Sequence, residues 1–134
     1  MNVDPRLHHC AQQIAPETLK SVLEMYEQLG FKVVYRPPEN KTWAMVGQEQ
    51  LRFAIQIVEV ADKPIEDLDI KRKTHIAFIS DDPQAVINTI KSWAESKNIK
   101  FREGGWSERE RYFDLPDIFI NFVVEVMHTS IEEG

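Results

Sequence analysis

The feature that most constrains the fold of this chain is an internal repeat. The stretch HCAQQIAP at residues 9–16 is matched by HIAFISDDP at residues 75–83. The histidines that begin the two stretches lie 66 residues apart (75 minus 9), and the prolines that end them lie 67 residues apart (83 minus 16). The dipeptides Phe31-Lys32 and Ile99-Lys100 continue the match at a spacing of 68 (99 minus 31). A repeat that keeps the type and order of its elements predicts two equivalent supersecondary units.

The first unit reads as a strand, a helix and three further strands. The helix is expected to follow Ala15-Pro16, because proline suits the first turn of a helix. Gly30 is expected to end it in the left-handed conformation. Its apolar stripe, at helical spacing, consists of Leu19, Val22, Leu23, Tyr26 and Leu29. The strands are expected within residues 6–14, 31–35, 42–46 and 51–60.

The second unit repeats this order. Asp82-Pro83 predicts a helix start, with aspartate as the cap and proline at the first helical position. The apolar stripe of this helix consists of Val86, Ile90, Trp93 and Ala94. The strands are expected at residues 74–79, 99–102, 109–113 and 118–127. Residues 61–72 are polar and lack strand alternation, so they are predicted to be the linker.

These elements predict an α+β fold made of two paired βαβββ units. Repeat 1 covers about residues 6–60 and repeat 2 about residues 73–127. Neither unit is expected to cover its sheet alone, so pairing of units within the chain or across a dimer is expected, giving a curved mixed sheet with a concave groove. The length of 134 residues is typical of one domain, residues 1–134.

The composition excludes several kinds of partner. The formal charge of -6 argues against nucleic acid and anionic membranes, which favour a basic surface. Cys10 is the only cysteine, which fits a reducing compartment. Neither a signal peptide nor a segment of membrane-spanning length is recognisable, so a cytoplasmic location is expected.

Alternation of side chains along the strands predicts which polar residues face the groove. In the strand at 51–60, the apolar face that packs on the helix comprises Leu51, Phe53, Ile55 and Ile57. Gln56 therefore faces the groove. By the same rule His75 faces it from the strand at 74–79, and Glu125 faces it from the last strand. In the first strand, alternation alone does not choose between His8 and His9, but the repeat makes His9 the counterpart of His75.

The predicted groove residues form a candidate metal site. They are His9, Gln56, His75 and Glu125. Two imidazoles, an amide oxygen and a carboxylate suit a divalent ion such as nickel, cobalt, zinc, manganese or iron. Such an ion polarises a carbonyl or lowers the pKa of a bound water. A lone strand histidine is more often a hydrogen-bonded structural residue than a ligand, and the same holds for Gln56. The matching places of the residues in the two repeats favour a shared site.

The sequence resembles the vicinal-oxygen-chelate superfamily, which includes glyoxalase I, methylmalonyl-CoA epimerase, extradiol dioxygenases, and fosfomycin- and bleomycin-resistance proteins. The resemblance covers residues 6–127, and its motifs are HCAQQI, MYEQLGF, FAIQIVEV, THIAF and YFDLPDIFINFVVEV. It implies paired βαβββ units and a metal held by the first and fourth strands of each. The implied ligands are again His9, Gln56, His75 and Glu125, a set similar to that of methylmalonyl-CoA epimerase and some glyoxalases.

The chain departs from the family pattern near its end. Residues 114–118 read Asp-Leu-Pro-Asp-Ile where the family usually has Asp-Pro-Asp-Gly. Glu125 then falls about three residues later than in the family pattern. Asn121, which alternation puts on the same face, is therefore an alternative fourth ligand.

The first functional hypothesis is a metal-dependent lyase or isomerase of the glyoxalase type. Its substrate would be a small carbonyl or carboxylate compound, with Glu125 as acidic ligand and base. Arg52 shares the face of Gln56 and is a candidate partner for an anionic substrate group. Trp106, Arg109 and Arg111 are expected in a loop around Gly104-Gly105. The sequence does not single out glutathione or coenzyme A, and a homodimer is the expected assembly of the family.

The second hypothesis is a metal-free small-molecule binding protein of the bleomycin-resistance type. The charge of -6 and the groove candidates Trp43, Phe119 and Met127 are compatible with it. An extradiol dioxygenase ranks third, because its iron site uses two histidines and one carboxylate and an added amide would crowd it.

Overall fold

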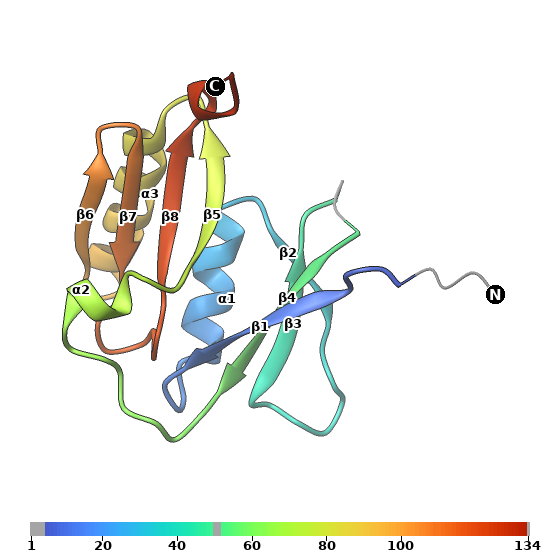
Figure 1. Ribbon diagram of the computed structural model, residues 1–134. Coiled ribbons are helices and arrows are strands. Elements are labelled where there is room, and N and C mark those ends of the chain that lie inside the picture. Colours follow the sequence, from blue (N-terminus) through green and yellow to red (C-terminus); the bar gives the residue numbers. More distant parts are fainter. Residues whose placement is uncertain (1–4, 50–51, 134) are drawn as a thin grey trace. The chain divides into compact units, whose positions relative to one another are not determined.

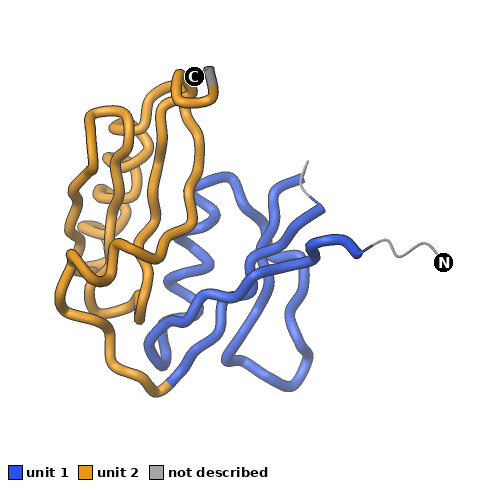
Figure 2. Tube along the Cα trace, in the orientation of Figure 1, with its two compact units in different colours: residues 1–60 blue, residues 61–134 orange. Residues whose placement is uncertain are grey.

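A computed structural model describes residues 5–49 and 52–133 of the chain. The chain divides into two compact units, residues 1–60 and residues 61–134 (Figure 2). Each unit contains one four-stranded mixed sheet. In the described part of the chain, no helix is both long enough and apolar enough to cross a membrane.

The first unit is a strand, a helix and three strands (Figure 1). Its elements are β1 (His9–Ile14), α1 (Leu19–Gln28), β2 (Lys32–Tyr35), β3 (Trp43–Gly47) and β4 (Ala54–Glu59). The sheet order is β1-β4-β3-β2, with β1 parallel to β4 and the other neighbours antiparallel. The first and last strands of the unit therefore lie side by side.

The second unit has the same topology. Its elements are α2 (Leu68–Lys71), β5 (His75–Ser80), α3 (Pro83–Ser96), β6 (Arg102–Ser107), β7 (Glu110–Asp114), β8 (Val123–His128) and a 3-10 helix (Thr129–Glu133). The sheet order is β5-β8-β7-β6, with β5 parallel to β8. The predicted repeat of βαβββ units and the α+β class are confirmed.

Local signals in the sequence explain where two of the helices begin or end. Asp82 accepts a hydrogen bond from the backbone N–H of Ala85 (3.1 Å) and caps α3, and Pro83 follows at its first position. At the end of α1, Gly30 has a φ of 85°, and its N–H donates to the carbonyl of Glu27. Both signals were predicted.

One face of each sheet packs on the helix of its own unit. In β4, Ile55 and Ile57 are buried and face α1; in β8, Val124 and Val126 are buried and face α3. The predicted alternation is confirmed for Ile55 and Ile57 of β4. The prediction that Phe53 shares their face is wrong, because Phe53 lies before β4, is only partly buried and lines a pocket together with Gly47 and Ala54. Leu51 lies outside the described residues, and in β8 the residues of both faces are buried up to Val126. We call the opposite face of each sheet, turned away from the unit's own helix, the groove face.

Three predicted boundaries are wrong. α1 begins at Leu19 rather than near Pro16, because Glu17 has a φ of 64° and the chain turns there first. The strand predicted at 99–102 starts only at Arg102, so β6 runs through residues 102–107. The strand predicted at 118–127 starts at Val123.

The apolar residues before β8 mimic a strand in the sequence without forming one. The N–H groups of Ile118 and Phe119 both donate to the carbonyl of Leu115, which folds the chain into a turn. The side chains of this segment are buried in the unit, among them Leu115, Ile118, Phe119, Ile120 and Phe122. Burial on all sides, rather than alternate exposure, explains their apolar character.

The glycine pair at 104–105 belongs to a strand, not to a loop. Gly104 lies in β6 and pairs with Tyr112 of β7, and Trp106 also lies in β6. A Cβ atom on Gly104 would lie 2.4 Å from the Tyr112 hydroxyl oxygen, so the Tyr112 ring needs the space that glycine leaves. Of the residues predicted to lie in the loop, Arg111 is in β7 and only Arg109 lies in the turn.

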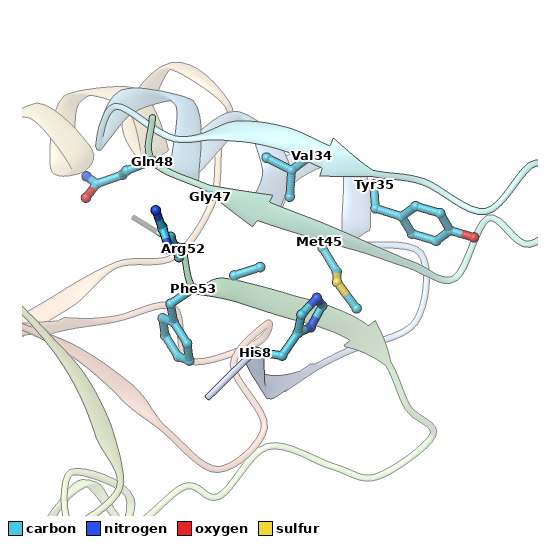
Figure 3. A pocket seen from close by; sticks show the side chains of 9 residues that line it. His8, Val34, Tyr35, Met45, Gly47, Gln48, Arg52 and Phe53 are labelled. Carbon is cyan, nitrogen blue, oxygen red and sulfur yellow. The ribbon is translucent and has the colours of Figure 1, made fainter. Parts of the chain in front are cut away.

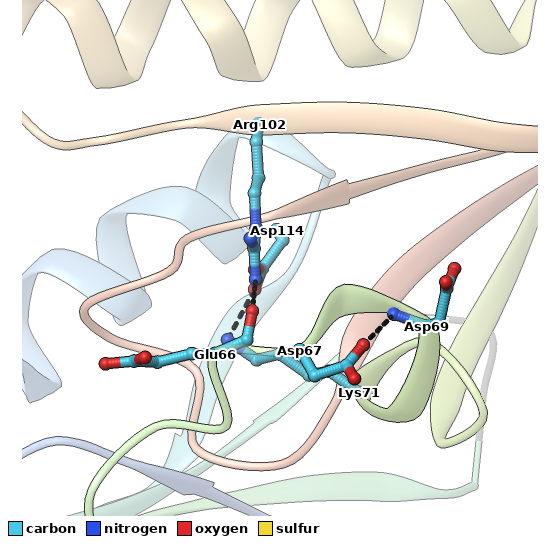
Figure 4. A network of polar contacts seen from close by, with 6 residues as sticks. All are labelled: Glu66, Asp67, Asp69, Lys71, Arg102 and Asp114. Carbon is cyan, nitrogen blue, oxygen red and sulfur yellow. Dashed lines mark hydrogen bonds and ion pairs between the residues drawn. The ribbon is translucent and has the colours of Figure 1, made fainter.

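The segment predicted as a polar linker contains α2 and a buried ion cluster (Figure 4). Lys71 is fully buried, and its Nζ lies 2.8 Å from Asp114 Oδ1. Arg102 Nε donates to Asp114 Oδ2 at 2.7 Å, and Arg102 Nη2 donates to the carbonyl of Glu66 at 3.3 Å. Asp67 caps α2 by accepting from the N–H of Asp69. Residues 66–71 are therefore anchored to β6 and β7.

Replacing Asp114 by alanine is expected to destabilise the protein by about 3–5 kcal/mol, because it leaves the buried Lys71 ammonium without its counter-ion. The matched control is Asp117→Ala, which removes an exposed carboxylate 3.7 Å from Lys100. The control substitution should lower the free energy of unfolding by less than about 0.5 kcal/mol. Urea unfolding measures both values; a similar loss in the two variants would contradict the role of the cluster.

Candidate functional site

In the first unit, His9 and Gln56 lie on the groove face of neighbouring strands. His9 pairs with Ala54 and Ala11 pairs with Gln56 in the parallel register of β1 and β4. Gln56 alternates with the buried Ile55 and Ile57, so its side chain points away from α1. His9 is exposed and Gln56 is partly exposed.

In the second unit, His75 and Glu125 lie close together on the groove face. Ala77 pairs with Glu125 in the parallel register of β5 and β8. His75 Nε2 is 3.8 Å from Glu125 Oε1. The imidazole is about one-third exposed (34%), whereas the carboxylate is nearly buried (7% exposed). This pair is accessible to a ligand mainly from the histidine side.

The two pairs occupy equivalent places in the repeated topology. Gln56 lies beside the residue two positions after His9, and Glu125 lies beside the residue two positions after His75. The residues just before the two histidines, His8 and Thr74, accept matching backbone hydrogen bonds of 3.0 Å, from Ala54 and Val123. Gln56 and Glu125 are therefore structural counterparts.

The register also distinguishes Glu125 from the alternative Asn121. Asn121 is exposed and lies in a bend before β8, so strand alternation does not extend to it. The prediction that Asn121 shares the strand face of Glu125 is wrong, because the strand begins at Val123.

Hydrogen bonding fixes the protonation pattern of His75. Its Nδ1 lies 3.0 Å from the carbonyl oxygen of Arg72, which only accepts, so Nδ1 carries a proton. In the neutral imidazole the lone pair then sits on Nε2, the atom that faces Glu125. A lone pair and a carboxylate oxygen are both acceptors, so a proton or a cation between them would stabilise the pair.

The environment of Glu125 favours its protonated form. Burial raises the pKa of this carboxyl, the nearby His75 opposes the rise, and Glu110 adds to it. A carboxyl with a raised pKa suits proton transfer near neutral pH better than an ordinary surface glutamate does.

Aromatic side chains flank the His75 imidazole, and alternation alone did not identify them. The Trp106 ring centroid lies 5.1 Å from that of His75 and 5.0 Å from that of Tyr112. The Arg72 guanidinium carbon lies 5.8 Å from the centroid of the Trp106 ring. Tyr112 pairs directly with Glu125 in the register of β7 and β8. The signal that points to Tyr112 is its place in β7 opposite Gly104, which requires the hairpin to be known.

His8 remains a neighbour of the candidate site rather than part of β1. Its Nδ1 lies 2.8 Å from Nδ1 of His9, so one ring donates to the other. This contact leaves Nε2 of His9 as the ring nitrogen able to bind a ligand.

The donor chemistry fits a divalent ion. Two ligands at about 2.1 Å from one ion lie roughly 3.0–4.2 Å apart, depending on the angle between them. The 3.8 Å between His75 Nε2 and Glu125 Oε1 falls in this range. Among the described residues, no group of three or more His, Cys, Asp or Glu side chains gathers as a metal site. Each unit supplies one histidine nitrogen and one side-chain oxygen as possible ligand atoms.

Replacing Glu125 by glutamine is expected to change how stability depends on pH in metal-free protein. Burial makes the pKa of Glu125 higher in the folded protein than in the unfolded chain. Ionised Glu125 therefore destabilises the folded protein at a pH above the folded-state pKa, and this penalty is absent at a pH below the unfolded-state pKa, where the carboxyl is protonated in both states. Relative to wild type, Glu125→Gln should therefore gain stability as pH rises from about 4 to about 8.

Urea unfolding in the presence of a chelator measures this trend. The matched control is Glu95→Gln, at an exposed position on α3. A difference between wild type and Glu125→Gln that stays constant with pH would contradict the prediction.

Comparison with known proteins shows similarity in fold but not in sequence. No model of a known protein family and no curated protein sequence matches the chain. Solved structures that match over nearly the whole chain share 12–18% identity. These similarities confirm the expected resemblance to the vicinal-oxygen-chelate proteins at the level of the fold.

Three of these structures illustrate the range of activities on this fold. A mutant of the fosfomycin resistance protein FosX from Listeria monocytogenes, complexed with Mn(II) and 1S,2S-dihydroxypropylphosphonic acid, has a TM-score of 0.60 and 16% identity, covering 96% of this chain and 95% of that one. The trypanothione-dependent glyoxalase I of Leishmania major has a TM-score of 0.61 and 16% identity, covering 97% and 91%. The antibiotic-binding protein TnmS3 from Streptomyces sp. CB03234 has a TM-score of 0.59 and 12% identity, covering 96% and 98%.

Proposed function

We propose that this protein is a metal-dependent lyase or isomerase of the glyoxalase type, working as one domain formed by both units. His9, Gln56, His75 and Glu125 would hold one divalent ion. The observation that carries the proposal is the matching register that makes Gln56 and Glu125 counterparts beside their histidines. The hydrogen bond from His75 Nδ1 to the Arg72 carbonyl supports it, because metal-binding histidines commonly donate their second nitrogen to such an oxygen.

The proposed chemistry is proton transfer at the carbon next to a carbonyl or carboxylate group. A divalent ion supplies Lewis acidity that stabilises negative charge on the substrate oxygen. Glu125 takes up the proton from carbon, and its burial keeps water from competing for that position. The Arg72 carbonyl and the Trp106 ring hold the His75 imidazole in place while this happens.

A second candidate function is metal-free binding of a small molecule. It is favoured by the similarity in fold to TnmS3, described as an antibiotic-binding protein. The two functions differ in whether a divalent ion stabilises the protein.

Thermal unfolding of chelator-treated protein with added nickel, cobalt, zinc or manganese tests the metal proposal. At a metal concentration of about 100 times Kd, the melting temperature of wild type should rise by roughly 5–10 °C. Gln56→Ala and Glu125→Ala should lose this rise. The matched control Gln13→Ala removes a partly exposed glutamine from β1 and should keep it.

The result also separates the two candidate functions. If added metal does not raise the melting temperature of wild type, or raises that of Gln56→Ala and Glu125→Ala equally, the metal site is excluded. Metal-free small-molecule binding would then be the remaining candidate function. Turnover of hemithioacetals or 2-methyl-branched acyl thioesters would then identify the substrate of a metal-loaded enzyme.

We further propose a homodimer in the cytoplasm, the assembly expected of the family and the compartment suited to a chain with Cys10 as its only cysteine. Sedimentation at micromolar concentration should give about twice the chain mass of 15.6 kDa. A single species at the monomer mass would contradict the dimer.

A further inference from the structure

The groove face of the first unit contains a pocket whose floor is made of very small residues (Figure 3). Gly47 of β3 and Ala54 of β4 are directly paired and lie side by side. The pocket has a volume of about 520 Å³, within the range of small-molecule sites. It is next to the candidate metal ligands, since Ala54 also pairs with His9 and Met45 pairs with Gln56.

The walls of this pocket are apolar and its polar groups carry no negative charge. Val34, Met45 and Phe53 line it, and Arg52 and Gln48 lie at its edge. None of the described lining residues is acidic, although the chain has 22 aspartates and glutamates. A cationic edge around an apolar hollow is complementary to an organic anion.

The second unit uses the equivalent position differently. Met45 of β3 pairs with Gln56, and Tyr112 of β7 pairs with its counterpart Glu125. Gly47 and Asp114 each lie two residues further along these strands, so Asp114 is the counterpart of Gly47. There the Lys71 ammonium lies 2.8 Å from Asp114, and both side chains are fully buried. In the second unit, the Lys71 side chain thus supplies a cation at this position.

The first unit has no such internal occupant among its described residues. A floor of glycine and alanine replaces the aspartate, and the pocket remains accessible. This difference between the repeats points to a bound ligand, because buried Asp114 and Lys71 fill the position in the second unit, whereas in the first unit it lines a pocket.

We propose that this pocket binds an organic anion with a compact apolar body, such as an arylalkyl carboxylate. The apolar body lies over Gly47 and Ala54, and the carboxylate interacts with Arg52. If the proposed function holds, on which this second role rests, the pocket positions such a substrate with its reacting carbonyl toward Gln56. Binding of the anion itself requires no metal.

The test is a titration of metal-free protein, in the presence of EDTA, with phenylacetate and with 2-phenylethylammonium, followed by ¹H–¹⁵N NMR. Phenylacetate should bind at least tenfold more tightly than the cation of similar size. Arg52→Gln should weaken phenylacetate about 3–10-fold, the effect of losing one charge-assisted contact at an exposed edge. Ala54→Leu should abolish binding by filling the floor.

Matched controls separate pocket effects from general ones. Arg36→Gln removes an exposed arginine outside this pocket, and Ala85→Leu enlarges an exposed alanine on α3. Both should bind phenylacetate as wild type does. The NMR spectrum of each variant shows directly whether it is folded, and the comparison of anion with cation in wild type does not depend on any variant.

The outcomes distinguish this inference from the proposed function. Absence of phenylacetate binding, equal affinity for the cation, or full binding by folded Ala54→Leu would overturn the pocket assignment, whether or not the protein binds metal. Phenylacetate binding that follows the predicted pattern, in a protein that no divalent ion stabilises, would support the pocket and reject the metal site.

Discussion

The parallel pairing of the first and last strands in each unit is the constraint on which the candidate site depends. It brings Gln56, 47 residues after His9 (56 minus 9), onto the strand beside it. In the second unit it does the same for Glu125, 50 residues after His75 (125 minus 75). Parallel neighbours require a crossover, and α1 and α3 with their antiparallel strands provide it. The helices thereby cover one face and leave the polar residues on the other.

The sequence predicted well wherever side chains alternate in regular strands. The faces of Gln56 and His75 followed from period-two patterns, and the repeat resolved the order of the elements. The prediction of strands failed where residues are apolar, or are glycine, for a reason other than strand alternation. Phe119 and its neighbours are apolar because they are buried within a turn. Gly104 lies in a strand, where glycine is depleted, because it makes room for the Tyr112 ring. The burial of Lys71 could not be predicted either, because its counter-ion Asp114 lies far away in the sequence.

The two units keep one topology while differing in chemistry at matched positions. An amide in one unit corresponds to a carboxylate in the other, and Gly47 corresponds to Asp114. The differences at these positions give the second unit a buried carboxyl group that can exchange a proton, and they give the first unit a pocket.

The chain connection between the two units is short, because hydrogen bonds hold it at both ends. The N–H of Val60 donates to the carbonyl of Ile14 in the first unit, and the N–H of Ile65 donates to the carbonyl of Ile120 in the second. Only residues 61–64 therefore act as a tether, spanning at most roughly 17 Å between those two attachment points. So short a connection leaves few backbone dihedral angles between the two attachment points that those hydrogen bonds do not constrain.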